Sequence, residues 1–207
     1  MANVPETKTQ VLIVGAGPAG LVMALCLAKC GVKSVIIERQ PDINPHPKAH
    51  ELNTRSLEIL ASLGISLEEL SAEASPKSDG CRIAFCTTIN EEFGAIDLLK
   101  DIDDPEKYDR HLESDVPYLN ISQTEVERII RRHAAAHPHI DLRLGHEWQS
   151  VETKAHGTRS SIKDRSDDRF YDIDADWLIA ADGAGSRVRQ ARGTNAVVNG
   201  SDSGKRL

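Results

Sequence analysis

The sequence lacks the long apolar runs and the basic clusters that define two large classes of protein. Its richest apolar stretch is broken by glycine, proline and lysine between residues 15 and 29, so no window approaches the roughly 18 apolar residues of a membrane span. The 207 residues carry a net charge of −7, and no Lys/Arg cluster is longer than Arg131-Arg132. This charge argues against a nucleic-acid or anionic-membrane surface. We therefore expect no nucleic acid and no membrane among the partners, but small molecules or proteins.

Export signals, paired cysteines and metal motifs are also missing. The opening residues show no apolar core after a basic head, so we expect no signal peptide and a cytoplasmic location. The four cysteines lack Cys-x-x-Cys spacing, which predicts reduced and inert thiols. His133 and His137 are four residues apart, but Pro138 ends their helix and no third ligand follows at a metal-site spacing, so we expect no metal.

What the sequence does contain is a strand, helix, strand unit over residues 10–39. Continuous apolar runs at 10–14 and 34–38 are typical of strands that are covered on both faces of a parallel sheet. Between them, apolar residues at helical spacing predict a helix over 18–30, with Gly31 just past its end. The unit predicts an α/β fold with a Rossmann-like parallel sheet.

Capping signals and apolar patterns predict further elements along the chain. They are a helix capped by Asn53 or Thr54 and closed by Gly64, a short helix with a capping box at Ser66 and Glu69, a strand at 81–85, a helix opened by the capping box 122–125, a strand at 140–144, a meander of β runs at 147–154, 158–163 and 169–175, and a buried strand at 177–181. We expect the rest of 71–118 to be loop-like, with an acidic, solvated excursion over 91–115.

A glycine-rich turn, Gly15-Ala-Gly17-Pro-Ala19-Gly20, lies between the first strand and the first helix. This context is the one that a dinucleotide-binding fingerprint requires. Gly15 permits a tight turn, Gly17 lets a pyrophosphate approach the backbone, and Gly20 lets the helix pack close to the strand. The start of the helix then offers free N–H groups and partial positive charge to phosphates.

An acidic residue completes this fingerprint. Glu38 lies eighteen residues after Gly20, at the end of the second predicted strand, where it can accept hydrogen bonds from an adenosine ribose. A carboxylate there repels a 2′-phosphate, so the site prefers FAD or NAD to NADP. The alternative is a glycine-rich turn with no ligand.

Three separated elements in this order resemble the FAD-dependent aromatic hydroxylases, the single-component flavoprotein monooxygenases that include the phenol and para-hydroxybenzoate hydroxylases. The first is the glycine fingerprint with Glu38 and Arg39. The second runs from His46 to Leu60, and the third from Leu178 to Arg189. The resemblance spans residues 8–192 and concerns the N-terminal portion of the family pattern.

The resemblance implies FAD as cofactor and NADPH or NADH as reductant. Asp182 and Gly183 match the family's Asp-Gly element, whose aspartate contacts the ribityl and pyrophosphate region of FAD. Arg55 matches an arginine that approaches the pyrophosphate, and Gln123 matches a glutamine that faces the cofactor. The expected cofactor-binding residues are therefore Gly15, Gly17, Ala19, Gly20, Glu38, Arg39, Arg55, Gln123, Asp182 and Gly183, and no catalytic residue is assigned.

Each residue taken from the resemblance also has an ordinary structural interpretation. Asp182-Gly183 can be a strand-ending turn, and Arg55 can be a surface arginine paired with Glu58 or Glu51. Gln123 can be a polar residue at a helix start.

The function implied by the resemblance is FAD-dependent hydroxylation of a phenolic or polyketide-like molecule in secondary metabolism, using NAD(P)H and oxygen. We expect FAD-binding segments at 5–75 and 120–192, a loop-rich fragment of the substrate domain at 76–119 and a disordered tail at 193–207. Soon after Arg192, the family pattern continues into further substrate-binding sheet and a Gly-Asp motif. The alternatives are an incomplete FAD-binding fragment, a half-enzyme completed by a second polypeptide or a homodimer partner, and a flavin-dependent dehydrogenase.

Overall fold

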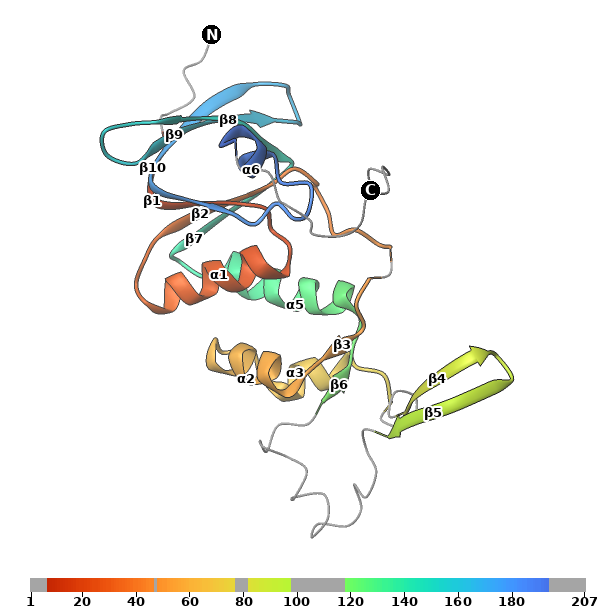
Figure 1. Ribbon diagram of the computed structural model, residues 1–207. Helices are drawn as coiled ribbons and strands as arrows, with labels where there is room; N and C mark the ends of the chain where they lie inside the picture. The colour runs from red at the N-terminus through yellow and green to blue at the C-terminus, as the bar shows by residue number, and fades with distance from the viewer. Residues whose placement is uncertain (1–6, 47, 77–81, 98–117, 194–207) are drawn as a thin grey trace.

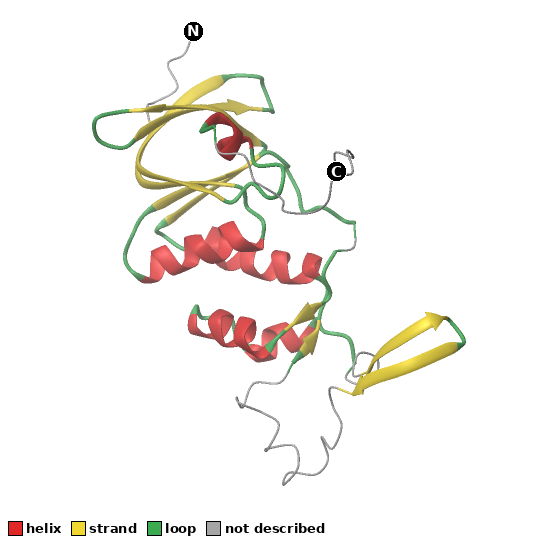
Figure 2. Ribbon diagram, in the orientation of Figure 1, coloured by secondary structure: helices red, strands yellow, loops and turns green. Residues whose placement is uncertain are grey.

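A computed structural model of the chain describes residues 7–46, 48–76, 82–97 and 118–193. Its centre is a six-stranded sheet, covered on one face by two helices, with two shorter helices in a further layer beyond them (Figures 1 and 2). The strand order is β7 (Ile140–Leu144), β2 (Ser34–Glu38), β1 (Thr7–Val14), β10 (Phe170–Ala180), β9 (Thr158–Asp164) and β8 (His146–Thr153). No helix within the described ranges has the length and apolar character needed to cross a bilayer.

The parallel half of the sheet is the strand, helix, strand unit that the sequence predicts. β1 pairs in parallel with β2 and with β10, and β2 pairs in parallel with β7. Helix α1 (Pro18–Lys29) connects β1 to β2 and packs with α5 (Gln123–Ala136) against one face of the sheet. Leu12 and Ile13 point to opposite faces, and both are fully buried, which confirms the apolar-run interpretation.

The other half is the predicted antiparallel meander of β8, β9 and β10. The sequence interpretation placed two separate strands at 169–175 and 177–181, and that division is wrong: β10 is one strand of 11 residues. Its first part lies between β1 and β9, whereas Trp177 pairs only with β1 and is 72% exposed. The C-terminal part of β10 is therefore not the fully buried strand that its apolar sequence predicts.

The helices outside the sheet begin where their capping residues predict. The Asn53, Ser66 and Ser122 side chains cap α2 (Thr54–Ser62), α3 (Leu67–Ala72) and α5, each accepting a backbone N–H of the first turn. A two-residue ladder of β3 (Glu51–Leu52) and β6 (Leu119–Asn120) joins the segments before α2 and α5. A short helix, α6 (Arg187–Ala191), follows β10.

The region from 71 to 118 is less loop-like than expected. β4 (Arg82–Thr88) and β5 (Glu91–Asp97) form an antiparallel hairpin that extends away from the helices (Figure 1). The predicted strand at β4 is confirmed except for Cys81, which lies outside the described residues. β5 was missed because its acidic residues and Gly94 hide a short alternating pattern. The remainder of the acidic excursion and the tail after residue 193 also lie outside the described residues.

Candidate functional site

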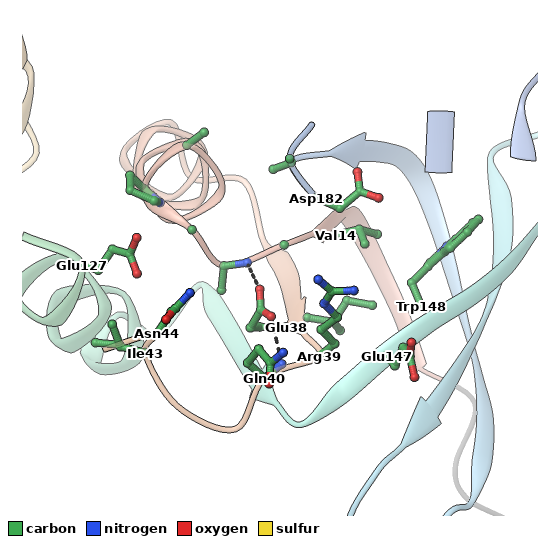
Figure 3. Close-up of a pocket in the computed structure, with 18 of the residues that line it drawn as sticks. Val14, Glu38, Arg39, Gln40, Ile43, Asn44, Glu127, Glu147, Trp148 and Asp182 are labelled. Atoms are coloured by element: carbon green, nitrogen blue, oxygen red, sulfur yellow. Dashed lines mark hydrogen bonds between the residues drawn. The ribbon is translucent and has the colours of Figure 1, made fainter. Parts of the chain in front are cut away.

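A cavity of about 570 Å³ lies at the carboxyl ends of β1, β2 and β10. In an open α/β sheet, this edge is where ligands bind, and the volume is in the usual range of cofactor sites. The wall consists of residues 14–19, 37–40, 42–44, 146–148 and 181–185, together with Lys48, Glu127, Arg131 and Arg187. Figure 3 shows Glu127 and Asn44 on one side, Asp182 and Trp148 on the other, and Glu38 between them.

The three glycines of the turn differ in what a side chain at each position would meet. Gly15 has a φ of +104°, and a Cβ there would lie 2.4 Å from the Ala181 carbonyl oxygen. A Cβ on Gly20 would lie 1.9 Å from the Gly15 carbonyl oxygen, so Gly20 permits the close packing of helix and turn. A Cβ on Gly17 would meet nothing within 4 Å. Protein packing therefore requires Gly15 and Gly20, whereas Gly17 leaves open space at the cavity.

The start of α1 faces this space. Gly17 is its N-cap, Pro18 is its first residue, and no side chain among the described residues caps it. The first turn carries no acidic residue. The helix start therefore offers backbone N–H groups and partial positive charge to an anion in the cavity.

Glu38 joins the glycine turn to the loop after β2. Its Oε2 accepts the Ala16 N–H at 3.0 Å, and its Oε1 accepts the Gln40 N–H at 2.9 Å (Figure 3). Each carboxylate oxygen can accept a further hydrogen bond. The carboxylate is thus held in the cavity wall by two backbone groups, with acceptor capacity left for a ligand hydroxyl.

Asp182 lies across the cavity at the end of β10. Its Oδ2 accepts the backbone N–H groups of Arg187 at 2.7 Å and Val188 at 3.3 Å. Its Oδ1 is buried and has no hydrogen-bond partner within the part of the chain that the structure describes. A buried carboxylate oxygen without a donor is destabilising, so this atom fits a site that receives a hydroxyl or N–H from a ligand.

The structure also brings residues to the cavity that the sequence analysis did not assign. Trp148 of β8 is buried, and its Nε1 donates to Ser160 Oγ at 3.2 Å, which fixes the indole in the wall. Arg187 pairs with Glu147 on the same side. Glu127 and Arg131 of α5 complete the opposite side. Glu127 could have been noticed from the sequence as a carboxylate next to the apolar Val126 on the predicted amphipathic helix, and both residues are buried in the structure.

Three of the ten predicted site residues do not line the cavity. Gly20 lies beneath the turn, where it permits the packing described above. The Arg55 side chain on α2 is 79% exposed and pairs with Glu58 at 3.1 Å, as its ordinary interpretation expects. Gln123 donates from Nε2 to Glu127 Oε1 at 2.5 Å, so it contacts a cavity residue without lining the cavity itself. The other seven residues lie together in the cavity wall.

Comparisons with known proteins agree with this geometry. The family described as FAD binding domain matches residues 8–204. The 2,4-dichlorophenol 6-monooxygenase of Delftia acidovorans is 34% identical over 182 residues, 87% of this chain and 30% of that protein. Para-nitrophenol 4-monooxygenase of Pseudomonas sp. (strain WBC-3) is 29% identical over 200 residues, 91% of this chain and 43% of that protein.

A solved structure is also similar to this chain. The flavin-dependent monooxygenase PieE, in complex with FAD and substrate, matches with a TM-score of 0.79 and 35% identity, over 92% of this chain and 33% of that one. The chain therefore spans between 30% and 43% of the length of these relatives.

Proposed function

This chain belongs to the FAD binding domain family, and from that premise we propose that its cavity binds FAD with the diphosphate at the start of α1. The predicted resemblance to FAD-dependent aromatic hydroxylases is confirmed for the N-terminal part of their length, as is the α/β fold. The observation that carries the proposal is the convergence of the glycine turn, Glu38 and Asp182 on one cavity.

Each part of an FAD molecule has a chemical counterpart in the wall. The Glu38 carboxylate would accept hydrogen bonds from the adenosine ribose, and the open space at Gly17 would admit the diphosphate. The unpartnered Asp182 Oδ1 would accept a hydroxyl of the ribityl chain, which removes the cost of leaving that oxygen buried alone. Gly183, with a φ of +81°, follows Asp182 in the turn after β10 and lines the same cavity.

We further propose that the bound cofactor serves the hydroxylation of a phenolic molecule with NADH or NADPH and oxygen. The support is sequence similarity, because relatives named as phenol monooxygenases match most of this chain. Bound FAD supplies the redox chemistry, and the residues of this chain bind it, orient it and exclude water from one side. The relatives have more than half of their length outside the matched region, so a substrate-facing wall would come from further polypeptide.

FAD titration tests the cofactor proposal directly. Bound FAD should show quenched or shifted flavin fluorescence that saturates with protein, together with a structured visible absorbance. FMN lacks the adenosine part, so the contacts at Glu38 predict that FMN binds much more weakly. A protein that stays colourless after incubation with excess FAD would overturn the proposal.

The short coverage of the relatives favours a second candidate, an FAD-binding module whose turnover needs further polypeptide. The two candidates differ in their products. Oxidation of NADH or NADPH that yields a hydroxylated phenol in proportion to oxygen consumed supports the hydroxylase. FAD binding with hydrogen peroxide as the reduced-oxygen product, at a rate that a phenol does not change, supports the module.

A further inference from the structure

One cavity residue has a buried donor that the protein does not use. Arg131 lies one helical turn after Glu127 on α5, and its side chain is only 14% exposed. Its Nε is buried and has no hydrogen-bond partner within the described ranges. Leaving one N–H of a charged group buried without an acceptor is destabilising, so the arrangement is expected where a ligand supplies the acceptor.

The remaining cations near the cavity are placed differently. Arg187 pairs with Glu147, and its side chain is half exposed. Arg39 and Lys48 are exposed residues on the loop after β2. Arg55 lies outside the cavity on α2, in contact with Glu58. Arg131 is thus the cavity cation most withdrawn from water among the described residues.

The ion pair that Arg131 makes with Asp42 is weak enough for a ligand anion to replace Asp42. Its Nη1 lies 3.7 Å from Asp42 Oδ1, and the Asp42 side chain is 91% exposed. At this distance, and with its carboxylate in water, the pair contributes little free energy, because water solvates the Asp42 carboxylate equally well. A diphosphate could therefore replace Asp42 as the partner of the guanidinium, with only a small loss of free energy from the broken Asp42 contact.

Helix α5, which carries Arg131, packs beside α1. Ile130, next to Arg131, is buried in the same core cluster as Leu21 and Leu25 of α1. The start of α1 and Arg131 then belong to one cavity wall. Helix-start N–H groups and a guanidinium together form an anion site in which the planar donor fork can make paired hydrogen bonds to phosphate oxygens.

We propose that Arg131 is the cation that binds the FAD diphosphate in this protein, a role that the sequence analysis assigned to Arg55. The inference rests on the proposed binding of FAD. It adds a binding residue from α5. The Arg131 side chain lines the cavity, whereas Arg55 does not.

The test compares ligands with and without phosphate, using the whole chain. Dissociation constants for FAD, riboflavin, ADP and adenosine are measured for the parent protein and for Arg131→Gln, Arg131→Lys and Arg55→Gln, by fluorescence and calorimetry. Arg131→Gln should weaken FAD and ADP by roughly tenfold or more, since a charge-assisted pair is lost, while adenosine binding stays unchanged. Arg131→Lys should recover part of the loss, and Arg55→Gln should match the parent.

Asp42→Asn provides a variant that leaves Arg131 in place. Removal of the competing carboxylate should leave FAD and ADP binding equal to or tighter than in the parent. If the parent binds FAD and Arg131→Gln keeps the parent ratio of ADP to adenosine affinity, or if Arg55→Gln shows the loss instead, the role of Arg131 is refuted while FAD binding stands. If the parent binds neither FAD nor ADP, both proposals fail. Far-ultraviolet circular dichroism and urea midpoints confirm that each variant is folded.

Discussion

At the scale of single residues, substitution can distinguish the glycines that packing requires from those that leave room for a ligand in residues 15–20. Gly20→Ala places a Cβ 1.9 Å from the Gly15 carbonyl oxygen, which is backbone and cannot move aside cheaply. We expect a loss of about 3 kcal/mol in the free energy of unfolding, at the upper end of overpacking effects.

Gly17→Val meets open space, so its free energy of unfolding should stay within about 1 kcal/mol of the parent value while FAD binding is lost. Urea unfolding and FAD titration of both variants measure this; a Gly17→Val protein with parent FAD affinity contradicts the placement of the diphosphate.

The carboxylate of Glu38 gives a second residue-scale prediction. Glu38→Ala removes an acceptor for the ribose and also releases the Ala16 and Gln40 N–H groups. FAD affinity should fall by about 1.5–3 kcal/mol, the usual contribution of hydrogen bonds to a charged group. Glu152→Ala, an exposed acid on β8 away from the cavity, is the matched control. Equal FAD affinity in the two variants would show that Glu38 does not bind the cofactor.

The predictability of individual site residues follows from how local their placement is. The glycines and Glu38 could be predicted because one strand, turn, helix, strand unit fixes them relative to each other. Trp148 and Arg131 could not, since their positions depend on how the meander curls and how α5 is rotated against α1. Arg55 was inferred by resemblance, and the structure places it on the solvent side of α2.

At the scale of elements, an ion cluster joins the strands of the meander and predicts a pH dependence. Arg159 of β9 donates to both carboxylate oxygens of Asp174 on β10, at 2.6 and 2.8 Å, and Lys154 lies 3.3 Å away. Hydrogen bonds from the Arg159 guanidinium, with a smaller contribution from Lys154, hold the pKa of the Asp174 carboxyl well below its usual range. Because the folded pKa is below the unfolded one, the stabilisation is present above about pH 4 and is lost as the pH falls toward the folded pKa.

Replacement of the carboxylate should remove this dependence. Asp174→Asn is expected to lower the free energy of unfolding by about 1 kcal/mol at pH 7, a value reduced by the partial exposure of the cluster. Urea unfolding from pH 7 to pH 3 should show the difference from the parent narrowing in acid. Asp172→Asn in the same strand is the control, and a difference that stays constant down to pH 3 would contradict the account.

Element boundaries show where sequence patterns are incomplete. The sequence patterns predicted two separate strands at 169–175 and 177–181, but β10 is continuous through residue 176 because pairing with β1 resumes at Trp177. In β5, acidic residues suggested a solvated loop, whereas the strand is formed by pairing with β4. In both cases the partner strand, which is not visible in a local pattern, decides the outcome.

At the scale of the whole molecule, the described residues divide into a packed α/β body and a hairpin with little burial. Leu12 and Ile13 of β1 are fully buried, whereas Ile89 in the hairpin turn is fully exposed and Phe93 of β5 is 70% exposed. Phe85 and Phe93 contact each other across the hairpin, with ring centroids 6.2 Å apart. A two-stranded hairpin that buries so little apolar surface is only marginally stable.

Hydrogen exchange should therefore differ sharply between the two parts. Amides of residues 82–97 should exchange through local opening, with protection of at most about a hundredfold over an unfolded chain, while those of β1 should exchange only through global unfolding. Mass spectrometry of the two peptides at two protein concentrations measures this, because a second copy covering the hairpin would make its protection rise with concentration. Equal protection of both peptides at low concentration would mean that the hairpin is packed as firmly as the sheet.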